Sequence, residues 1–242
     1  MTLFICGNSH VRALRAGMQA LAGQVPATQV TVFPLGTADN EAAPFSTIEN
    51  GRVVLTNGRF RAKLYKNFGF TSFEPVQRWG LCLGTHNARL FRNESWLRAA
   101  PAWLGLPGMQ PVPEAVFAQM VATDQQHIRA FIDQLLETGL RPFLISAPWP
   151  VRHHPIMAET GVRPEIVRAI DARARALFGA WLAERGLDLI QPPPGTADAE
   201  GFLKPEMAKG GDDPYHGNHR YGQLMMAKVL TEILGVSVTA EV

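Results

Sequence analysis

The chain has 242 residues, a length that suits one α/β domain with insertions, and its formal net charge is +2. A content of 46% hydrophobic and 18% charged residues excludes a disordered or fibrous protein. The basic residues are scattered along the sequence, which argues against a nucleic-acid partner, and no apolar run is long enough to span a membrane.

The two cysteines, Cys6 and Cys82, each lie in an apolar, strand-like segment. This placement predicts buried thiols in a reducing compartment instead of a disulfide or a metal site. The chain enters a strand-like segment at once, without the features of a secretory signal. We therefore expect a cytoplasmic protein with no membrane association, whose oligomeric state the sequence does not specify.

Short apolar runs alternate with helical patterns along the chain. The runs that we expect to form buried parallel strands are residues 3–6, 30–33, 81–83, 142–146 and 187–190. Helical periodicity covers residues 11–21, 114–136, 165–183 and about 221–234. The alternation predicts one α/β domain over residues 1–242, with three α/β/α layers and a doubly wound sheet of five parallel strands.

Two segments interrupt the alternation and are expected to be insertions, at about residues 40–78 and 92–113. In the first, residues 52–55 and 59–64 flank Asn57-Gly58, a pair typical of a β-hairpin turn. The second is rich in Trp, Pro, Leu and Gly, which fits either a lid or rim over a site or an ordinary surface excursion. Neither insertion has the length or pattern of a separate domain.

The first strand leads into the first helix through Gly7-Asn8-Ser9-His10. Ligands of open α/β folds bind at the carboxyl ends of the strands, where this segment delivers Ser9. The N–H groups at the start of the helix lie beside Ser9, so that its own N–H could bind an oxyanion while its Oγ attacks. A serine needs a base to accept its proton, because its hydroxyl is a weak nucleophile at neutral pH.

The best candidate for that base is His216, in the segment Asp213-Pro-Tyr-His216 ahead of the last helix. Asp213, three residues upstream, can orient the imidazole from within the same loop. Asp212 could orient it after a shift of the loop, and His219 could compete as the base, although it has no acid three residues before it. A strand-end serine can also be a helix cap and a loop histidine a solvated surface residue.

These two terminal segments resemble the first and last conserved blocks of the SGNH hydrolases, the GDSL-type esterases and lipases. Gly7-Asn8-Ser9-His10 is similar to their Gly-Asp-Ser-Leu block, with Asn8 in place of the acidic residue and His10 in place of an apolar one. Asp213 to Gly222 resembles the last block. The resemblance implies a flavodoxin-like three-layer fold, hydrolysis of acyl esters through an acyl-serine intermediate, and no cofactor.

The resemblance also implies an oxyanion hole completed by a glycine N–H after the second strand and an asparagine amide after the third. Gly36 fits the glycine position. Asn87 is the nearby amide after the third strand, although the family places its asparagine two residues beyond a glycine, where this chain has Thr85. Gly36 could instead be a turn glycine, and Asn87 a helix cap.

We expect, from these residues, a serine esterase in which Ser9 is the nucleophile, His216 the base and Asp213 its orienting acid. The oxyanion donors would be the Ser9 N–H, the Gly36 N–H and Asn87. The substrate would be a small-molecule or carbohydrate acyl ester, and the resemblance to the family implies an O-acetylated sugar as one such substrate. Trp149, in the loop after the fourth strand, could form a wall for the substrate or pack into the second insertion.

Three other functions compete with hydrolysis by a serine. Seven histidines raise a metal-dependent phosphoesterase, but the acidic ligands that a dinuclear site needs are missing from the first strand end, so we expect no metal. An SGNH-like binding module without activity would retain the fold with an incomplete oxyanion hole. An acyltransferase would use the same residues with a different acceptor.

Overall fold

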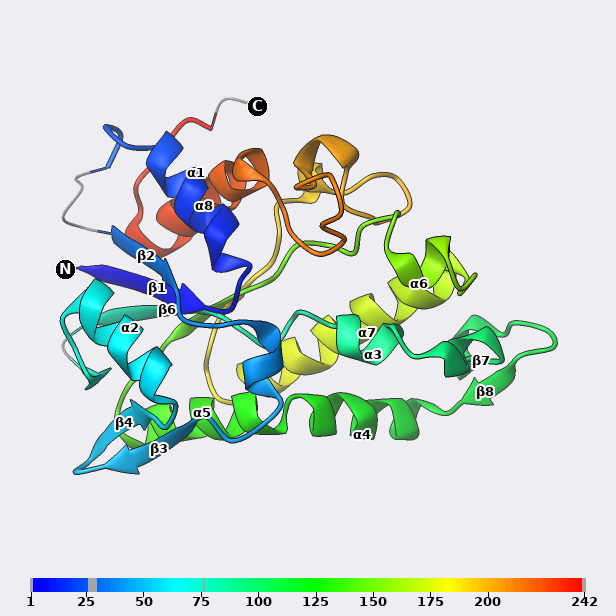
Figure 1. Ribbon diagram of the computed structural model, residues 1–242, viewed down its shortest axis with the longest axis horizontal. Helices are drawn as coiled ribbons and strands as arrows, with labels where there is room; N and C mark the ends of the chain where they lie inside the picture. Colours follow the sequence, from blue (N-terminus) through cyan, green and yellow to red (C-terminus); the bar gives the residue numbers. More distant parts are fainter. Residues whose placement is uncertain (1, 26–29, 76, 241–242) are drawn as a thin grey trace.

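The structure is a computed structural model that describes residues 2–25, 30–75 and 77–240, so residue 76 of the first predicted insertion lies outside the described residues. A parallel five-stranded sheet with the order β10-β9-β6-β1-β2 forms its centre (Figure 1). The strands are β1 (Leu3–Gly7), β2 (Val30–Pro34), β6 (Arg78–Cys82), β9 (Phe143–Ile145) and β10 (Leu189–Ile190). The predicted parallel sheet is confirmed, although the third strand begins earlier than expected, at Arg78.

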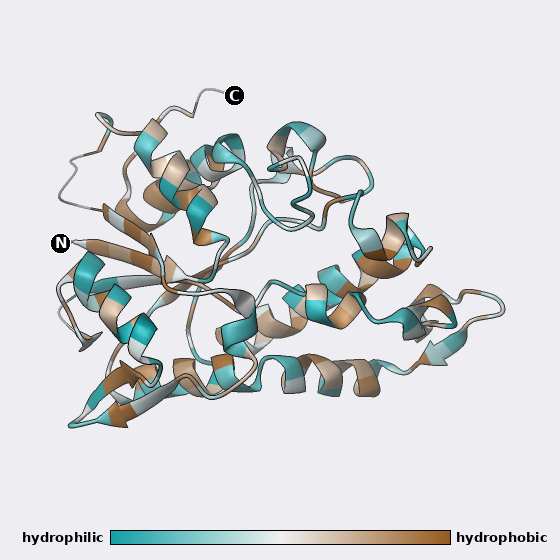
Figure 2. Cartoon of the chain, in the orientation of Figure 1, coloured by the Kyte–Doolittle hydropathy of each residue, from teal (hydrophilic) through white to brown (hydrophobic). Residues whose placement is uncertain are grey.

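Helices cover both faces of the sheet, which confirms the three-layer α/β/α architecture. They are α1 (Val11–Ala20), α2 (Gly58–Phe68), α3 (Ala88–Phe91), α4 (Glu114–Asp124), α5 (Gln126–Glu137), α6 (Pro155–Ala158), α7 (Pro164–Ala183) and α8 (His219–Leu234). Side chains alternate across β1, so Leu3 and Ile5 pack with α1 and α8, whereas Phe4 and Cys6 pack with α2, α5 and α7. Figure 2 shows these apolar strands between helices whose outer faces are more hydrophilic.

The first insertion contains a hairpin, but at a different position from the predicted one. β4 (Arg52–Leu55) pairs antiparallel with β3 (Ser46–Glu49) around Asn50-Gly51, and also with β5 (Ser72–Phe73). The expected second arm, residues 59–64, belongs to α2. Asn57 starts that helix by accepting a hydrogen bond from Arg59 N, and the helix buries Phe60, Leu64 and Phe68 along one face. The spacing of four between these apolar residues outweighs the turn signal of Asn57-Gly58.

The predicted helix over residues 114–136 is two helices, α4 and α5, which meet at Gln125. The Gln125 side chain is buried and its amide donates a 2.8 Å hydrogen bond to the carbonyl of Gly84, in the loop after β6. The break is therefore associated with a contact to a distant loop, which helical periodicity does not reveal.

The second insertion folds into two 3₁₀ turns and a short parallel strand pair. These are η2 (Glu94–Leu97), β7 (Ala99–Pro101), η3 (Ala102–Leu104) and β8 (Gln110–Val112). Trp96 is buried and donates a 2.7 Å hydrogen bond to the Leu90 carbonyl. β7 and β8 lie at the edge of the molecule remote from β1 (Figure 1), so the pair is a surface excursion and does not cover the carboxyl end of β1.

Cys6 and Cys82 are free and buried, as predicted. Burial, followed by the proximity of Glu41, raises the pKa of the Cys82 thiol to about 12, and burial likewise raises the pKa of Cys6. Both thiols therefore remain protonated at neutral pH and act as small apolar core residues. No helix in the described part of the chain is long and apolar enough to cross a bilayer.

Candidate active site

A tight turn joins β1 to α1 and exposes part of Ser9. Gly7 has a φ of 152°, and a Cβ at this position would stand 2.3 Å from the Cys82 carbonyl oxygen, so only glycine fits. Asn8 N donates to that same carbonyl, and Arg12 N donates to the Ser9 carbonyl as the helix begins. The turn therefore holds Ser9 at the carboxyl edge of the central sheet.

Ser9 meets His216 from the other end of the chain. His216 Nε2 lies 2.8 Å from Ser9 Oγ, and His216 Nδ1 lies 2.8 Å from Asp213 Oδ1 and 3.0 Å from Oδ2. A carboxylate can only accept, so Nδ1 carries the proton and donates it to Asp213. Nε2 is then the free acceptor for the Ser9 hydroxyl, which is the arrangement that proton transfer from serine requires.

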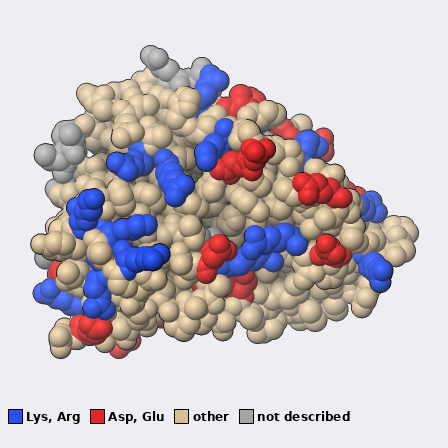
Figure 3. Space-filling model, viewed as in Figure 1, with Lys and Arg blue, Asp and Glu red and all other residues tan. Residues whose placement is uncertain are grey.

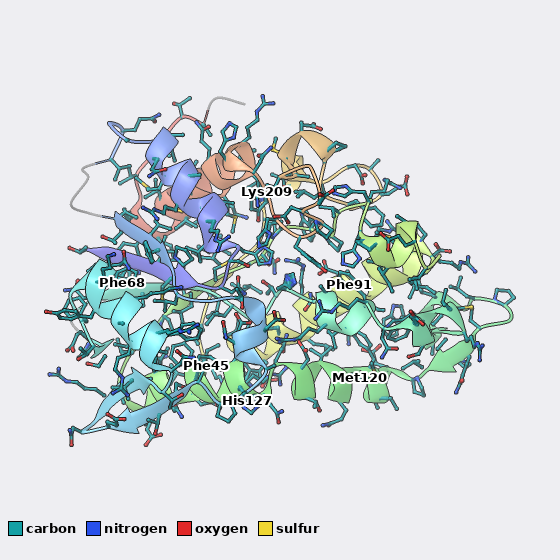
Figure 4. All side chains as sticks on the ribbon, in the orientation of Figure 1. Phe45, Phe68, Phe91, Met120, His127 and Lys209 are labelled. Atoms are coloured by element: carbon teal, nitrogen blue, oxygen red, sulfur yellow. The ribbon has the colours of Figure 1, made fainter. Side chains whose placement is uncertain are left out.

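Asp213 is held in place by its own loop. It accepts hydrogen bonds from Tyr215 N and His216 N, at 3.1 Å each, and from Lys209 Nζ at 2.7 Å. Lys209 is labelled in Figure 4, on the loop that leads to α8. Burial raises the pKa of Asp213, but the hydrogen bonds from Lys209 and His216 outweigh it and keep the pKa well below its ordinary value. The group is a carboxylate throughout the physiological range.

The loop is anchored where α8 starts. Asn218 caps that helix by accepting hydrogen bonds from Arg220 N and Tyr221 N, and Lys209 N donates to the His216 carbonyl. The two competing residues from the sequence, Asp212 and His219, are both exposed, and His219 is the first residue of α8. The structure brings Asp213 and His216, and not these two, to the serine.

Gly36 lies beside the end of β1, as the pairing of β1 with β2 requires. Its N–H makes only a long, 3.4 Å hydrogen bond to the Gly7 carbonyl, which already accepts a 2.8 Å bond from Leu35 N. A Cβ on Gly36 would come within 2.5 Å of the Phe60 ring, so a side chain would disturb the loop. The Gly36 N–H thus forms only a weak hydrogen bond, to the residue two positions before Ser9.

The side chain of Asn87 forms its hydrogen bonds with α7. It is buried, and its Nδ2 donates a 2.8 Å hydrogen bond to Asp171 Oδ1 and a 3.4 Å bond to the Asp171 carbonyl. It stands at the start of α3 without capping it through its side chain. The structure therefore does not bring the Asn87 amide together with Ser9 and Gly36.

A pair of histidines that sequence reasoning did not connect lies against His216. His10 Nε2 and His86 Nδ1 are 2.6 Å apart, and the His10 ring centroid is 4.6 Å from that of His216. Burial and then the neighbouring imidazoles lower the pKa of His10, and the same two causes lower that of His86 to about 3. Both are neutral at pH 7. His10 Nδ1 is buried without a hydrogen-bond partner among the described residues.

A second unforeseen contact involves Asn8, which stands where the GDSL block has an acid. Asn8 Nδ2 donates a 2.8 Å hydrogen bond to Glu41 Oε1, and Asn8 Oδ1 accepts one from His10 N. Burial raises the pKa of Glu41 to about 8, against the smaller, opposite effect of the bond from Asn8. Glu41 lies in the 3₁₀ turn η1 (Ala38–Glu41). Its carboxyl is mostly protonated at pH 7 and lies beside Asn8, the residue that replaces the acid of the GDSL block.

Trp149 lines a small cavity of about 20 Å³ beside the same histidines. The cavity also touches His10, His86 and Tyr215. The guanidinium of Arg175, on α7, lies 5.0 Å from the Trp149 ring centroid and donates to the carbonyls of the preceding loop. The structure therefore places Trp149 near the site, in contact with α7. Among the residues described, no three His, Cys, Asp or Glu side chains are grouped in a way that could hold a metal ion.

Comparisons with known proteins locate the fold. No protein-family model and no curated protein sequence matched the chain. Among solved structures, the M. smegmatis aryl esterase superposes with a TM-score of 0.51 at 12% identity, covering 98% of this chain and 100% of the esterase. A GDSL-like lipase from Bacteroides thetaiotaomicron aligns with a TM-score of 0.49 at 10% identity, over 97% of this chain and 88% of the lipase. A carbohydrate acetylesterase family member from Sinorhizobium meliloti aligns at 0.48 and 11%, over 97% and 100%.

The likeness to the aryl esterase extends over the entire domain, and the serine, histidine and aspartate of the two terminal blocks meet at one sheet edge. At 12% identity the likeness concerns the course of the chain and not its substrate. The protein has the fold of that aryl esterase.

Proposed function

We propose that the protein is a serine esterase that cleaves O-acyl esters. The observation that carries this proposal is the hydrogen-bonded chain from Ser9 Oγ to His216 Nε2 and from His216 Nδ1 to Asp213, with both bonds at 2.8 Å. The likeness in fold to an aryl esterase is consistent with it. Nucleophile, base and orienting acid each have a partner of the right chemistry at the right atom.

The reaction follows from these atoms. Ser9 Oγ attacks the ester carbonyl carbon while its proton passes to His216 Nε2, and the resulting imidazolium is stabilised by the Asp213 carboxylate. The imidazolium then gives the proton to the departing alcohol oxygen, which leaves an acyl-serine. A water molecule, deprotonated by the same nitrogen, attacks the acyl carbon and releases the acid, and the proton returns to Ser9 Oγ.

The proposed oxyanion donors are the backbone N–H groups of Ser9 and Gly36. Ser9 N lies next to the start of α1, where the helix dipole favours negative charge. Asn87 would join them only if its bond to Asp171 broke when substrate bound. The finer proposal for the substrate is a short acyl group, such as acetyl, on a small molecule or a carbohydrate. The two free, buried cysteines are consistent with a cytoplasmic location.

A fluorophosphonate probe tests the proposal directly. It should label the folded protein with time-dependent kinetics, and Ser9→Ala should abolish the labelling, because among the described residues no other hydroxyl is hydrogen-bonded to an imidazole. Ser95→Ala, at an exposed serine, is the matched control and should label like the wild type. A chelator should have no effect.

Two results would contradict the esterase. Hydrolysis that is lost with a chelator and persists in Ser9→Ala would identify a metal-dependent hydrolase. A folded protein that reacts with no probe and turns over no short-chain p-nitrophenyl ester would be a binding module. Turnover of p-nitrophenyl acetate with none of an acetylated-sugar panel would remove the carbohydrate from the proposal and retain the esterase.

A further inference from the structure

Charge is divided unequally along the chain. Residues 1–73 carry seven basic and three acidic side chains, a net charge of +4, whereas the remaining residues carry 16 and 18, a net charge of −2. One of those three acids, Glu41, is buried and mostly protonated at pH 7. The excess of positive charge thus belongs to the first 73 residues, which include α1 and α2.

Five of the exposed cations of this part gather on one side of the molecule. They are Arg12 and Arg15 on α1, and Arg59, Lys63 and Lys66 on α2, and together they are called the basic face below. Figure 3 shows blue side chains concentrated over α1 and α2, while red side chains lie mainly over the other half of this view. The fold therefore creates a positive surface from two helices that lie far apart in the sequence.

The members of the basic face are not neutralised by neighbours. Within the described part of the chain none of the five forms an ion pair, whereas the nearby Arg52 and Arg61 pair with Glu74 and Glu49. Arg59, Lys63 and Lys66 follow one another at intervals of four and three residues on α2, so they form a row about 10 Å long on one side of the helix. Exposed cations without counter-ions make a field that attracts anions.

The basic face borders the candidate active site. Arg12 lies in the first turn of α1, and its backbone N–H donates a 3.1 Å hydrogen bond to the Ser9 carbonyl. Lys63 Nζ donates a 3.0 Å hydrogen bond to the carbonyl of Leu35, the residue before Gly36. The positive charges therefore begin next to the two proposed oxyanion donors and extend away from them along α2.

We infer that the ester substrate is an extended polyanion, namely an acidic polysaccharide that carries carboxylates beside its O-acyl groups. This inference rests on the proposed function. A row of separate cations fits regularly spaced charges along a chain better than the single charge of a small molecule. An anionic membrane is disfavoured, because Tyr65 is the one large apolar side chain that the described structure exposes on these two helices, at 62%, which is too little to insert into lipid.

The experiment compares an O-acetylated uronate-containing oligosaccharide with its carboxyl-reduced, neutral counterpart. The wild type should hydrolyse the carboxylated substrate with a kcat/KM about tenfold or more higher, and the advantage should shrink as salt is raised. The triple variant Arg15→Gln, Arg59→Gln, Lys66→Gln should lose most of the advantage while the rate on the neutral substrate is unchanged. These three positions are chosen because neither Ser9 nor Gly36 is bonded to them.

The matched control removes three exposed cations elsewhere, in Arg98→Gln, Arg141→Gln, Arg163→Gln, and should keep the preference. Equal rates on the two substrates, or an equal loss of both rates in the two triple variants, would overturn the inference. Binding of a de-esterified acidic polysaccharide, measured by titration, should weaken with salt and in the first variant. If an oligonucleotide or anionic vesicles bind instead, the inference is likewise wrong.

The two proposals fail in different ways. A folded wild type that the probe does not label at Ser9 would refute the esterase, whereas titration with the de-esterified polymer would still report on the basic face. Normal labelling at Ser9 with no preference for carboxylated substrates would refute the inference about the basic face and leave the esterase standing.

Discussion

Single side chains in this site carry protonation states that their neighbours determine. Asp213 remains ionised because it accepts four hydrogen bonds from Lys209, His216 and Tyr215. Glu41 is mostly protonated at neutral pH because it is buried and its hydrogen bond comes from the neutral amide of Asn8. Both carboxyls come from segments that follow Ser9 in the chain, and only the ionised Asp213 is suited to stabilise an imidazolium.

Replacing Asp213 tests its role in orienting the base. Asp213→Asn should lower kcat by about 10⁴, because an amide can donate to His216 Nδ1 and thereby favour the tautomer whose Nε2 cannot accept the Ser9 proton. The measurement is steady-state hydrolysis of p-nitrophenyl acetate. The exposed neighbour provides the control, since Asp212→Asn should retain nearly full activity. A larger loss in Asp212→Asn than in Asp213→Asn would assign the orienting role to Asp212.

Glu41 predicts a specific dependence of stability on pH. The carboxyl has an ordinary pKa of 4.5 and a folded value of about 8, so unfolding releases a proton between these limits. The folded state therefore loses stability as pH rises from about 4.5 to about 8, by up to roughly 1.4 kcal/mol per pH unit. Glu41→Gln removes this loss. Its free energy of unfolding relative to the wild type should rise by about 3 kcal/mol between pH 5 and pH 8.

Urea denaturation at the two pH values measures this difference. Glu159→Gln, at an exposed acid, is the control. A difference between Glu41→Gln and the wild type that is the same at pH 5 and pH 8 would show that Glu41 ionises freely in the folded protein.

Pairs of elements position these side chains. The two helices that start at the proposed catalytic segments, α1 after Ser9 and α8 after His216, cross at glycines. A Cβ on Gly222 would lie 1.8 Å from the Ala13 carbonyl oxygen, and one on Gly17 would lie 2.0 Å from the Gly222 carbonyl carbon. The backbones are in direct contact, so the crossing helps to set the approach of His216 to Ser9.

Gly222→Ala should therefore destabilise the protein by more than about 3 kcal/mol, because the obstacle is backbone and cannot swing aside. It should also slow turnover in whatever fraction remains folded, since α1 and α8 must separate. Gly179→Ala, within α7, meets nothing closer than 3.6 Å and should be neutral or stabilising by up to about 1 kcal/mol. Thermal unfolding of Gly222→Ala and Gly179→Ala measures this difference in stability. Equal melting temperatures of the two variants would mean that α1 and α8 are loosely packed where they cross.

A buried ion pair near the site connects several parts of the fold. Arg175 and Asp171, both on α7, lie 2.7 Å apart and are each about 4% exposed. Arg175 also donates to the carbonyls of Ala147 and Pro148 after β9, and Asp171 accepts from Asn87 ahead of α3. The pair thus connects the helical layer to two loops at the carboxyl edge of the sheet.

Removing one partner should be costly. Arg175→Met leaves the Asp171 carboxylate buried without its cation and should cost about 3–5 kcal/mol in urea denaturation. The double variant Asp171→Asn, Arg175→Met should be more stable than Arg175→Met, because the stranded charge is gone. A double variant less stable than the single one would mean that the loop carbonyls, and not Asp171, account for the contribution of Arg175.

Much of the architecture could be predicted from local patterns. The apolar runs and helical periods predict the parallel sheet and its two helical layers, because the spacing of apolar residues determines which face of each strand or helix is buried. The same kind of reasoning failed at residues 59–64, where a turn signal was preferred to the spacing of Phe60, Leu64 and Phe68. It also missed the break at Gln125, which involves a contact with Gly84.

Three properties follow from the amino-acid sequence alone: the succession of strands and helices along the chain, the types of residue at its two ends, and the asymmetry of charge. Each depends only on residues adjacent in the sequence or on the number of charged residues. The contacts between distant residues arise only in the tertiary structure. These are the hydrogen bonds of Asn8 with Glu41, of His10 with His86 and of Asn87 with Asp171, together with the assembly of the basic face. Each of these joins residues from different elements, and their distances depend on how helices and loops settle on the sheet, which no local pattern encodes.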